Sequence, residues 1–95
     1  MTEKANELLR GTLELLALRA VRDESRHGWG IQQRINELSA GALTINQGSL
    51  YPALMRLQKR DLLKSEWRPS PSGRRARYYS LTPKGRRQLG VEIDI

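Results

Sequence analysis

Residues 46–57 read NQGSLYPALMRL, and the spacing of their leucines decides the fold. Leu50, Leu54 and Leu57 recur at i, i+4 and i+7, which places them on one face of a helix that we expect to end near Arg60. A glycine and a proline stand near the start of this helix, where a segment that only packed a core would gain nothing from them. The beginning of the helix is therefore the first candidate for a functional surface.

The helix start has its own signals. We expect Ser49 to cap the helix, so that Pro52 falls within the first turn, where no backbone hydrogen bond is lost. Gly48 would let the backbone approach a ligand closely. With the leucines facing the core, the residues expected to point outward in varying degree are Tyr51, Pro52, Met55, Arg56 and Lys59.

A first helix is expected over residues 6–21, where leucines and alanines spread over much of the surface. Such a helix needs cover on more than one side. Two interpretations stay open: a plain core helix, and a helix that also packs against a second copy of the chain.

A shorter helix follows, with Ile31, Ile35 and Leu38 on one face and His27 near its start. Gly41 is expected in the left-handed conformation common just past helix ends. Residues 42–45, ALTI, are expected to form a short strand.

Downstream, the alternation in LLKSEWRPSPSGRRARYYSLT predicts a β-hairpin, with the proline-rich PSPSG as its loop. Thr82 is placed to cap a last helix that begins at Pro83 and has Leu89 and Ile93 on one face. The predicted fold class is mainly α with a small β-hairpin, a winged helix-turn-helix formed by residues 1–95 as a single domain.

The positive charge is unevenly distributed along the chain. The net charge is +7, but the segment from Arg56 to Arg87 holds eleven basic and two acidic residues, a balance of +9. This is the pattern expected of a face that meets a polyanion, although charge runs are also common on solvated surfaces. The placement of the charge on an outward helix and an adjoining hairpin favours double-stranded DNA. The expected contacts are Gln47, Ser49, Tyr51, Pro52, Arg56 and Lys59 on the helix, with Arg74, Arg75 and Arg77 on the hairpin.

Composition argues against other classes of protein. The chain has one histidine, no cysteine and no cluster of carboxylates with ligand or acid–base spacing, so we expect neither an enzyme nor a metal or cofactor site. It carries no run of about 20 apolar residues and no secretory signal pattern, so we expect a cytoplasmic protein without a membrane partner. Trp29 and Trp67 either line a ligand pocket or complete the small core.

Several motifs together resemble one family. HGWGIQQRI, INQGSLYPALMRLQKRDLLKSEW and GRRARYYSLTPKGRRQL occur in that order, after LLRGTLELLALRAV. The sequence is similar to the PadR family of bacterial winged-helix transcriptional regulators, in its short form with a single C-terminal helix or as a shortened chain. The resemblance spans nearly the whole chain.

The resemblance implies a homodimer that binds operator DNA, usually as a repressor, with the third helix in the major groove and the wing beside it. Members commonly respond to small aromatic or drug-like inducers. A two-fold dimer predicts a pseudo-palindromic operator. With so short a C-terminal region, the first and last helices are expected to make the dimer through Leu8, Leu9, Leu13, Leu89 and Ile93.

The rival interpretation is a winged-helix module that binds RNA or protein without operator specificity. Double-stranded RNA has a deep, narrow major groove that would not admit the third helix, so an RNA-binding version would need stacked aromatic side chains on an open face. The sequence pattern lacks such a face, which favours DNA.

Overall fold

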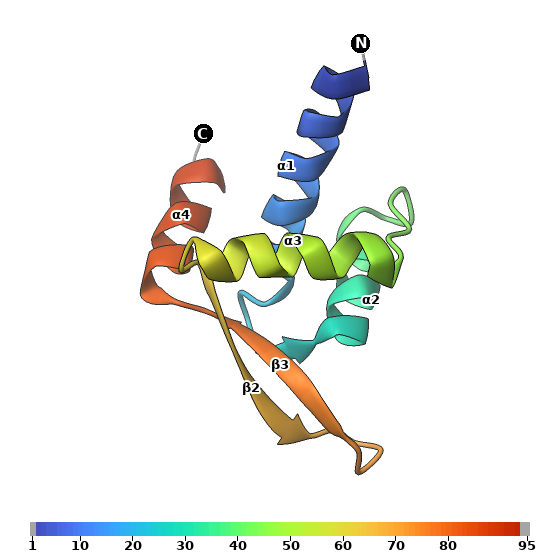
Figure 1. Cartoon of the computed structure of the whole chain (residues 1–95), viewed down its shortest axis with the longest axis vertical. Coiled ribbons are helices and arrows are strands. Elements are labelled where there is room, and N and C mark those ends of the chain that lie inside the picture. Colours follow the sequence, from blue (N-terminus) through green and yellow to red (C-terminus); the bar gives the residue numbers. More distant parts are fainter. Residues whose placement is uncertain (1, 94–95) are drawn as a thin grey trace.

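The computed structural model describes residues 2–93, with side chains for residues 11–90. The chain forms α1 (Thr2–Ala20), β1 (Arg26–His27), α2 (Gly28–Leu38), α3 (Gln47–Lys59), β2 (Leu63–Pro69), β3 (Arg75–Leu81) and α4 (Pro83–Ile93). Figure 1 shows α1 and α4 rising on one side of α3, with the β2–β3 hairpin on the other side. In the described residues, no helix is apolar over enough of its length to cross a membrane.

The core forms where the leucine face of α3 meets α1 and α2. Leu50, Leu54 and Leu57 are fully buried, as the spacing predicts, and Ile31 and Ile35 of α2 are fully buried against them. Each such side chain contributes about 1.5–3 kcal/mol when it leaves water. The predicted winged helix-turn-helix is confirmed, and α3 is held rigidly with its opposite face exposed.

The sheet has three antiparallel strands in the order β1-β3-β2. The predicted hairpin is confirmed, with Leu63 opposite Leu81 at its base. The third strand was not expected: Arg26 and His27 pair with Tyr79 and Tyr78. We call the β2–β3 hairpin with its loop, residues 63–81, the wing.

The prediction of a strand at residues 42–45 is wrong. Side chains of α2 and of the turn after it form hydrogen bonds with the backbone groups of Leu43 that a strand would use for pairing. The Leu43 N–H donates to Ser39 Oγ at 3.0 Å, and Asn36 Nδ2 donates to the Leu43 carbonyl at 3.4 Å. The apolar side chains of Leu43 and Ile45 pack against the core from an irregular segment. Gly41 is left-handed as predicted, with φ +82°.

The predicted start of α3 is also wrong. Asn46, rather than Ser49, is the cap: its Oδ1 accepts a hydrogen bond from the Ser49 N–H at 2.8 Å. Asparagine and serine are both preferred at helix N-caps, and these two residues stand only three positions apart, so the sequence alone did not decide between them. The helix therefore begins at Gln47, and Pro52 lies beyond the first turn.

The position of Pro52 removes one helical hydrogen bond. An N–H at position 52 would donate to the carbonyl of Gly48, four residues earlier, and proline has none. Gly48 is exposed, so water can satisfy this carbonyl. The proline is tolerated because it lies on the solvent side of α3.

Thr82 joins the start of α4 to the end of α3. Its hydroxyl donates to the Asp61 carbonyl at 2.6 Å and accepts from the Gly85 N–H at 2.9 Å, so the predicted cap is confirmed. A Cβ at Gly85 would come within 2.0 Å of the Leu62 carbonyl oxygen, which means that α4 packs directly on the turn after α3.

Two of the residues expected at a dimer interface are already covered within one chain. Leu13 and Leu89 are 9% and 2% exposed and belong to the core. The side chains of Leu8, Leu9 and Ile93 lie outside the described side chains. A dimer built on α1 and α4 would therefore not rest on Leu13 or Leu89.

Candidate nucleic-acid interface

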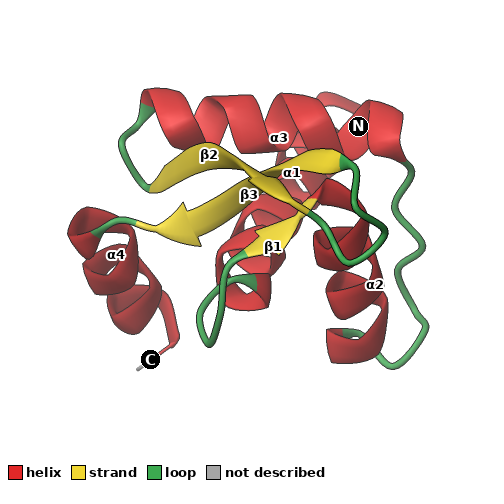
Figure 2. Ribbon diagram, turned by 90° about the horizontal axis from the view of Figure 1, so that it is seen from below, coloured by secondary structure: helices red, strands yellow, loops and turns green. Residues whose placement is uncertain are grey.

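The outer face of α3 and one face of the wing border a single groove. Figure 2 shows β2 and β3 running alongside α3. The groove has a volume of about 750 Å³ and is lined from α3 by Tyr51, Met55 and Lys59, and from the wing by Trp67, Arg75 and Arg77. The two elements that carry the excess positive charge therefore share one side of the molecule.

Ser65 fixes the wing to α3. Its hydroxyl oxygen lies 3.0 Å from Gln58 Nε2 of α3 and 2.8 Å from Arg77 Nε of β3, and both nitrogens donate to it. One oxygen on β2 thus connects the helix to the opposite strand of the hairpin. This connection sets the angle at which the two elements would meet a duplex.

The three wing arginines are exposed at or near the tip. Gly73, at φ +90°, makes the turn that a residue with a Cβ would strain, and Arg74 follows it directly. Arg75 and Arg77 are two positions apart on β3, so both lie on the strand face toward α3. The Arg77 guanidinium lies 5.6 Å from the ring centroid of Trp67. Within the described side chains, none of the three forms an ion pair, so their charge is available to a polyanion.

Arg56 is placed differently from the sequence expectation. Its Nε lies 2.6 Å from Glu14 Oε2 of α1, and Arg60 Nη1 lies 3.2 Å from the other oxygen of the same carboxylate. The Glu14 side chain is only 14% exposed. Arg56 therefore ties α3 to α1, on the flank of α3 away from the groove.

The other residues expected on α3 occupy its N-terminal end and its outer face. The Gln47 side chain is hydrogen-bonded to Gln32 of α2, which holds α2 against the first turn of α3. Ser49, Pro52 and Lys59 are exposed. The expected contacts on the helix are thus open to solvent, with Gln47 and Arg56 only partly so.

Tyr51 leans toward the wing and α2 while remaining 43% exposed. Its hydroxyl lies over Gly28, the first residue of α2. Burial raises the pKa of the neighbouring Tyr79 phenol above its ordinary value of 10.0; the Tyr51 phenol adds to the rise and Arg77 opposes it. Tyr79 therefore remains a neutral phenol at neutral pH and does not weaken the positive field of the groove.

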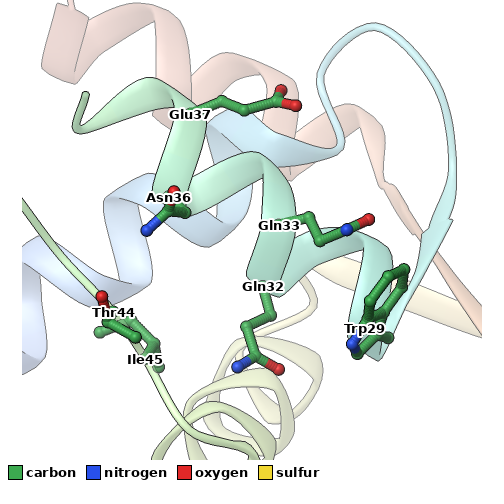
Figure 3. Close-up of a pocket in the computed structure, with 7 residues that line it drawn as sticks. All are labelled: Trp29, Gln32, Gln33, Asn36, Glu37, Thr44 and Ile45. Atoms are coloured by element: carbon green, nitrogen blue, oxygen red, sulfur yellow. The ribbon is translucent and has the colours of Figure 1, made fainter. Parts of the chain in front are cut away.

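Both tryptophans are largely exposed, so of the two alternatives left open by the sequence, the one in which they complete the core is wrong. Trp67 is 55% exposed because β2 has run past the core by that point, and Trp29 is 60% exposed. Trp29 lies at a second pocket, which has a volume of about 290 Å³. Figure 3 shows this side chain with Gln32 and Gln33 on α2 and Thr44 and Ile45 on the connection to α3. Gln32 links this pocket to Gln47 at the start of α3.

Sequence reasoning did not assign three residues to the nucleic-acid surface: Met55 and Trp67, which line the groove, and Ser65, which connects the wing to α3. Met55 is 60% exposed on α3. The signal for it was present, since it follows Tyr51 by one helical turn and Lys59 follows it by another. Ser65 and Trp67 lie on the same face of β2 as the buried Leu63, so the alternation alone would place them in the core. Only the pairing of β2 with β3 shows that the core ends before Trp67.

His27 serves the fold. Its Nδ1 accepts from the Gly30 N–H at 3.0 Å, which caps α2, and its ring meets Tyr78 edge-on. In the part of the chain that the structure describes, no three histidine, cysteine, aspartate or glutamate side chains gather as a metal site would require.

Comparison with known proteins agrees with this architecture. Transcriptional regulator Rv3488 of Mycobacterium tuberculosis is 39% identical over 83 residues, which cover 87% of this chain and 74% of that protein. The X-ray structure of a PadR-like transcription factor from Bacteroides fragilis aligns with a TM-score of 0.81 and 33% identity, over 95% of this chain and 84% of that one.

Bacillus subtilis PadR, solved in complex with operator DNA, aligns with a TM-score of 0.74 over 86% of this chain and 47% of that one. At 18% identity this likeness shows the fold alone. The model of the PadR-like family of transcriptional regulators matches residues 17–91, which include α2, α3 and the whole wing. The chain therefore belongs to the PadR-like family, whose members are transcriptional regulators and not enzymes.

Proposed function

We propose that this chain is a sequence-specific repressor that binds double-stranded operator DNA as a homodimer. The observation that carries the proposal is the shared groove, in which Lys59 of α3 and Arg75 and Arg77 of the wing face one space. An α-helix fits the major groove of B-DNA, and arginines enter a narrow minor groove, where the negative potential is concentrated. With Ser65 holding the two elements together, α3 and the wing would meet adjacent grooves of one duplex.

The solved complex of Bacillus subtilis PadR with operator DNA supports the proposal by analogy of fold. In this proposal Gln47, Ser49, Tyr51, Pro52 and Lys59 lie at the DNA face of α3, and Arg74, Arg75 and Arg77 contact phosphates or the minor groove. Arg56 acts indirectly, because it holds α3 against α1 through Glu14.

The homodimer would form through α1 and α4. These two helices pack together and rise on the side of the molecule opposite the wing, which leaves α3 and the wing free for DNA (Figure 1). Two copies related by a two-fold axis would read a pseudo-palindrome with half-sites about one helical turn apart or a multiple of it. Analytical ultracentrifugation of the full chain should give twice the mass of 10.9 kDa, and a single-chain mass would contradict this part.

The proposal includes a small-molecule inducer, with the pocket beside Trp29 as its candidate site. A ligand there would touch Gln32, which is hydrogen-bonded to the first residue of α3. Ligands found by thermal-shift screening should weaken DNA binding. Trp29→Ala should abolish their effect while leaving DNA binding without ligand intact, and equal responses of both proteins would exclude this site.

A mobility-shift assay tests DNA binding itself. Labelled duplex from the chain's own promoter region is competed with unlabelled specific duplex, unrelated duplex and double-stranded RNA. The proposal predicts that the specific duplex competes best. Preference for RNA, or equal competition by every DNA, would favour an interaction module without operator specificity.

A further inference from the structure

The outward strip of α3 is mostly apolar. Successive side chains are about 100° apart around a helix axis, and Gly48, Pro52, Met55 and Lys59 fall within about 30° of the direction opposite the four buried residues of α3, which are Leu50, Ala53, Leu54 and Leu57. All four are exposed, Met55 to 60%. Of their side chains, only that of Lys59, at the C-terminal end, carries a polar group. The residues that could read bases by hydrogen bonds through their side chains therefore lie on the flanks of the helix.

Packing does not account for this strip. A Cβ at Gly48 would meet only Asn46 Oδ1, at 3.3 Å, a tight contact that a shift of a few tenths of an ångström in the Asn46 side chain would relieve, so packing within the chain does not require glycine there. Pro52 removes a helical hydrogen bond, and Met55 exposes most of its thioether side chain to solvent beside Lys59 and the wing arginines. Gly48, Pro52 and Met55, which follow one another along this strip, are thus residues that the solvent-exposed face of a helix does not favour.

The major groove offers one apolar feature to such a strip, the C5-methyl group of thymine. Pro52 and Met55 are separated by about 4.5 Å along the helix axis, close to the spacing of about 3.4 Å between successive bases on one strand. A proline ring and a thioether can therefore cover methyl groups on neighbouring base pairs, and Gly48 lets the helix approach without a side chain in the way.

We propose that α3 reads thymine methyl groups through Pro52 and Met55, and that Met55 determines specificity in the operator. The inference rests on the proposed function and adds the chemistry of the site: each half-site carries adjacent T·A pairs beneath the middle of α3. Hydrogen bonds from Gln47 and Ser49 read positions nearer the helix start.

Replacing thymine by uracil tests the inference, because uracil lacks only the methyl group. The operator is first selected from a random duplex library with the full chain, and each thymine is then replaced singly. Affinity should fall about fourfold at one or two central positions, the loss expected for one apolar group of about 0.8 kcal/mol. Met55→Ala should remove the uracil effect at one of these positions.

Two further variants sharpen the test. Lys59→Ala is the matched control: it should weaken binding to all duplexes and keep the fourfold loss on uracil. Met55→Gln is nearly isosteric and carries an amide that pairs with adenine, so selection with this variant should shift the preferred base at one position from thymine to adenine. Since Met55 is exposed, circular dichroism should show the same fold for all three proteins.

The outcomes separate the two proposals. A selected operator whose affinity is unchanged by uracil at every thymine, or a Met55→Ala protein that keeps the whole uracil loss, would overturn the methyl-reading inference and leave DNA binding standing. A selection that enriches no sequence would overturn the proposed function itself.

Discussion

Gly28 lies directly against the Tyr51 side chain: a Cβ at Gly28 would come 2.6 Å from the Tyr51 hydroxyl oxygen and 2.9 Å from its ring carbon Cζ. The absence of a side chain at the first position of α2 thus sets where the phenol of α3 sits. Tyr51 in turn borders the groove between α3 and the wing. A residue outside the groove therefore positions one inside it.

Gly28→Ala should displace the Tyr51 phenol and lower operator affinity about tenfold, equivalent to about 1.4 kcal/mol. The clash involves the far end of a flexible side chain, so the fold should survive. Gly30→Ala is the matched control, because its Cβ would have only ordinary contacts, the nearest at 3.5 Å. That variant should bind DNA normally and gain up to about 1 kcal/mol of stability from the better helix former. Equal affinities of the two variants in a titration would refute the positioning role of Gly28.

Ser65→Ala should loosen the wing from α3, since it removes the oxygen that accepts from Gln58 and Arg77. We expect a loss of about 1–2 kcal/mol in unfolding free energy and about five- to tenfold weaker binding to the operator. Ser80→Ala, on the neighbouring strand, is the control and should change neither quantity much. A Ser65→Ala protein with unchanged operator affinity would show that the wing angle does not depend on this hydroxyl.

Glu14→Gln should weaken the attachment of α3 to α1 by removing the charge that Arg56 and Arg60 share. Urea denaturation should show a loss of about 1–2 kcal/mol, while affinity for unrelated DNA rises because two arginines are no longer neutralised. Glu37→Gln breaks only the exposed pair with Arg34 and should cost about 0.5 kcal/mol or less. If both variants lose the same stability, Glu14 is an ordinary surface charge.

The helices and the hairpin could be predicted from the sequence because each carries a strong local signal. The leucine spacing of α3 and the strand alternation of the wing do not depend on the rest of the chain. The strand at Arg26–His27 could not be predicted, since two residues have no periodicity and their pairing with Tyr79 and Tyr78 is a tertiary event. The cap of α3 was ambiguous because Asn46 and Ser49 both suit it.

The candidate site was predictable in outline and not in its ion pairs. Charge counting led to the wing arginines, which the structure leaves exposed. It also led to Arg56, but the partner of that residue is Glu14, 42 positions away on α1, and no local pattern reveals such a distant pair. Met55 was overlooked as a DNA-binding residue because a methionine adds no charge and no hydrogen bond, although helical spacing already placed it outward.

The salt dependence of operator binding tests the central claim, that α3 and the wing engage one duplex together. If six to eight basic groups meet phosphates, a plot of log Kobs against log salt concentration should have a slope of about −5 to −7. Replacing Arg74, Arg75 and Arg77 together by alanine should reduce its magnitude by about 0.9 for each phosphate that the wing no longer neutralises, with affinity falling at the same time. A slope near zero for the unaltered chain, or a slope that the triple wing replacement leaves unchanged, would contradict the account.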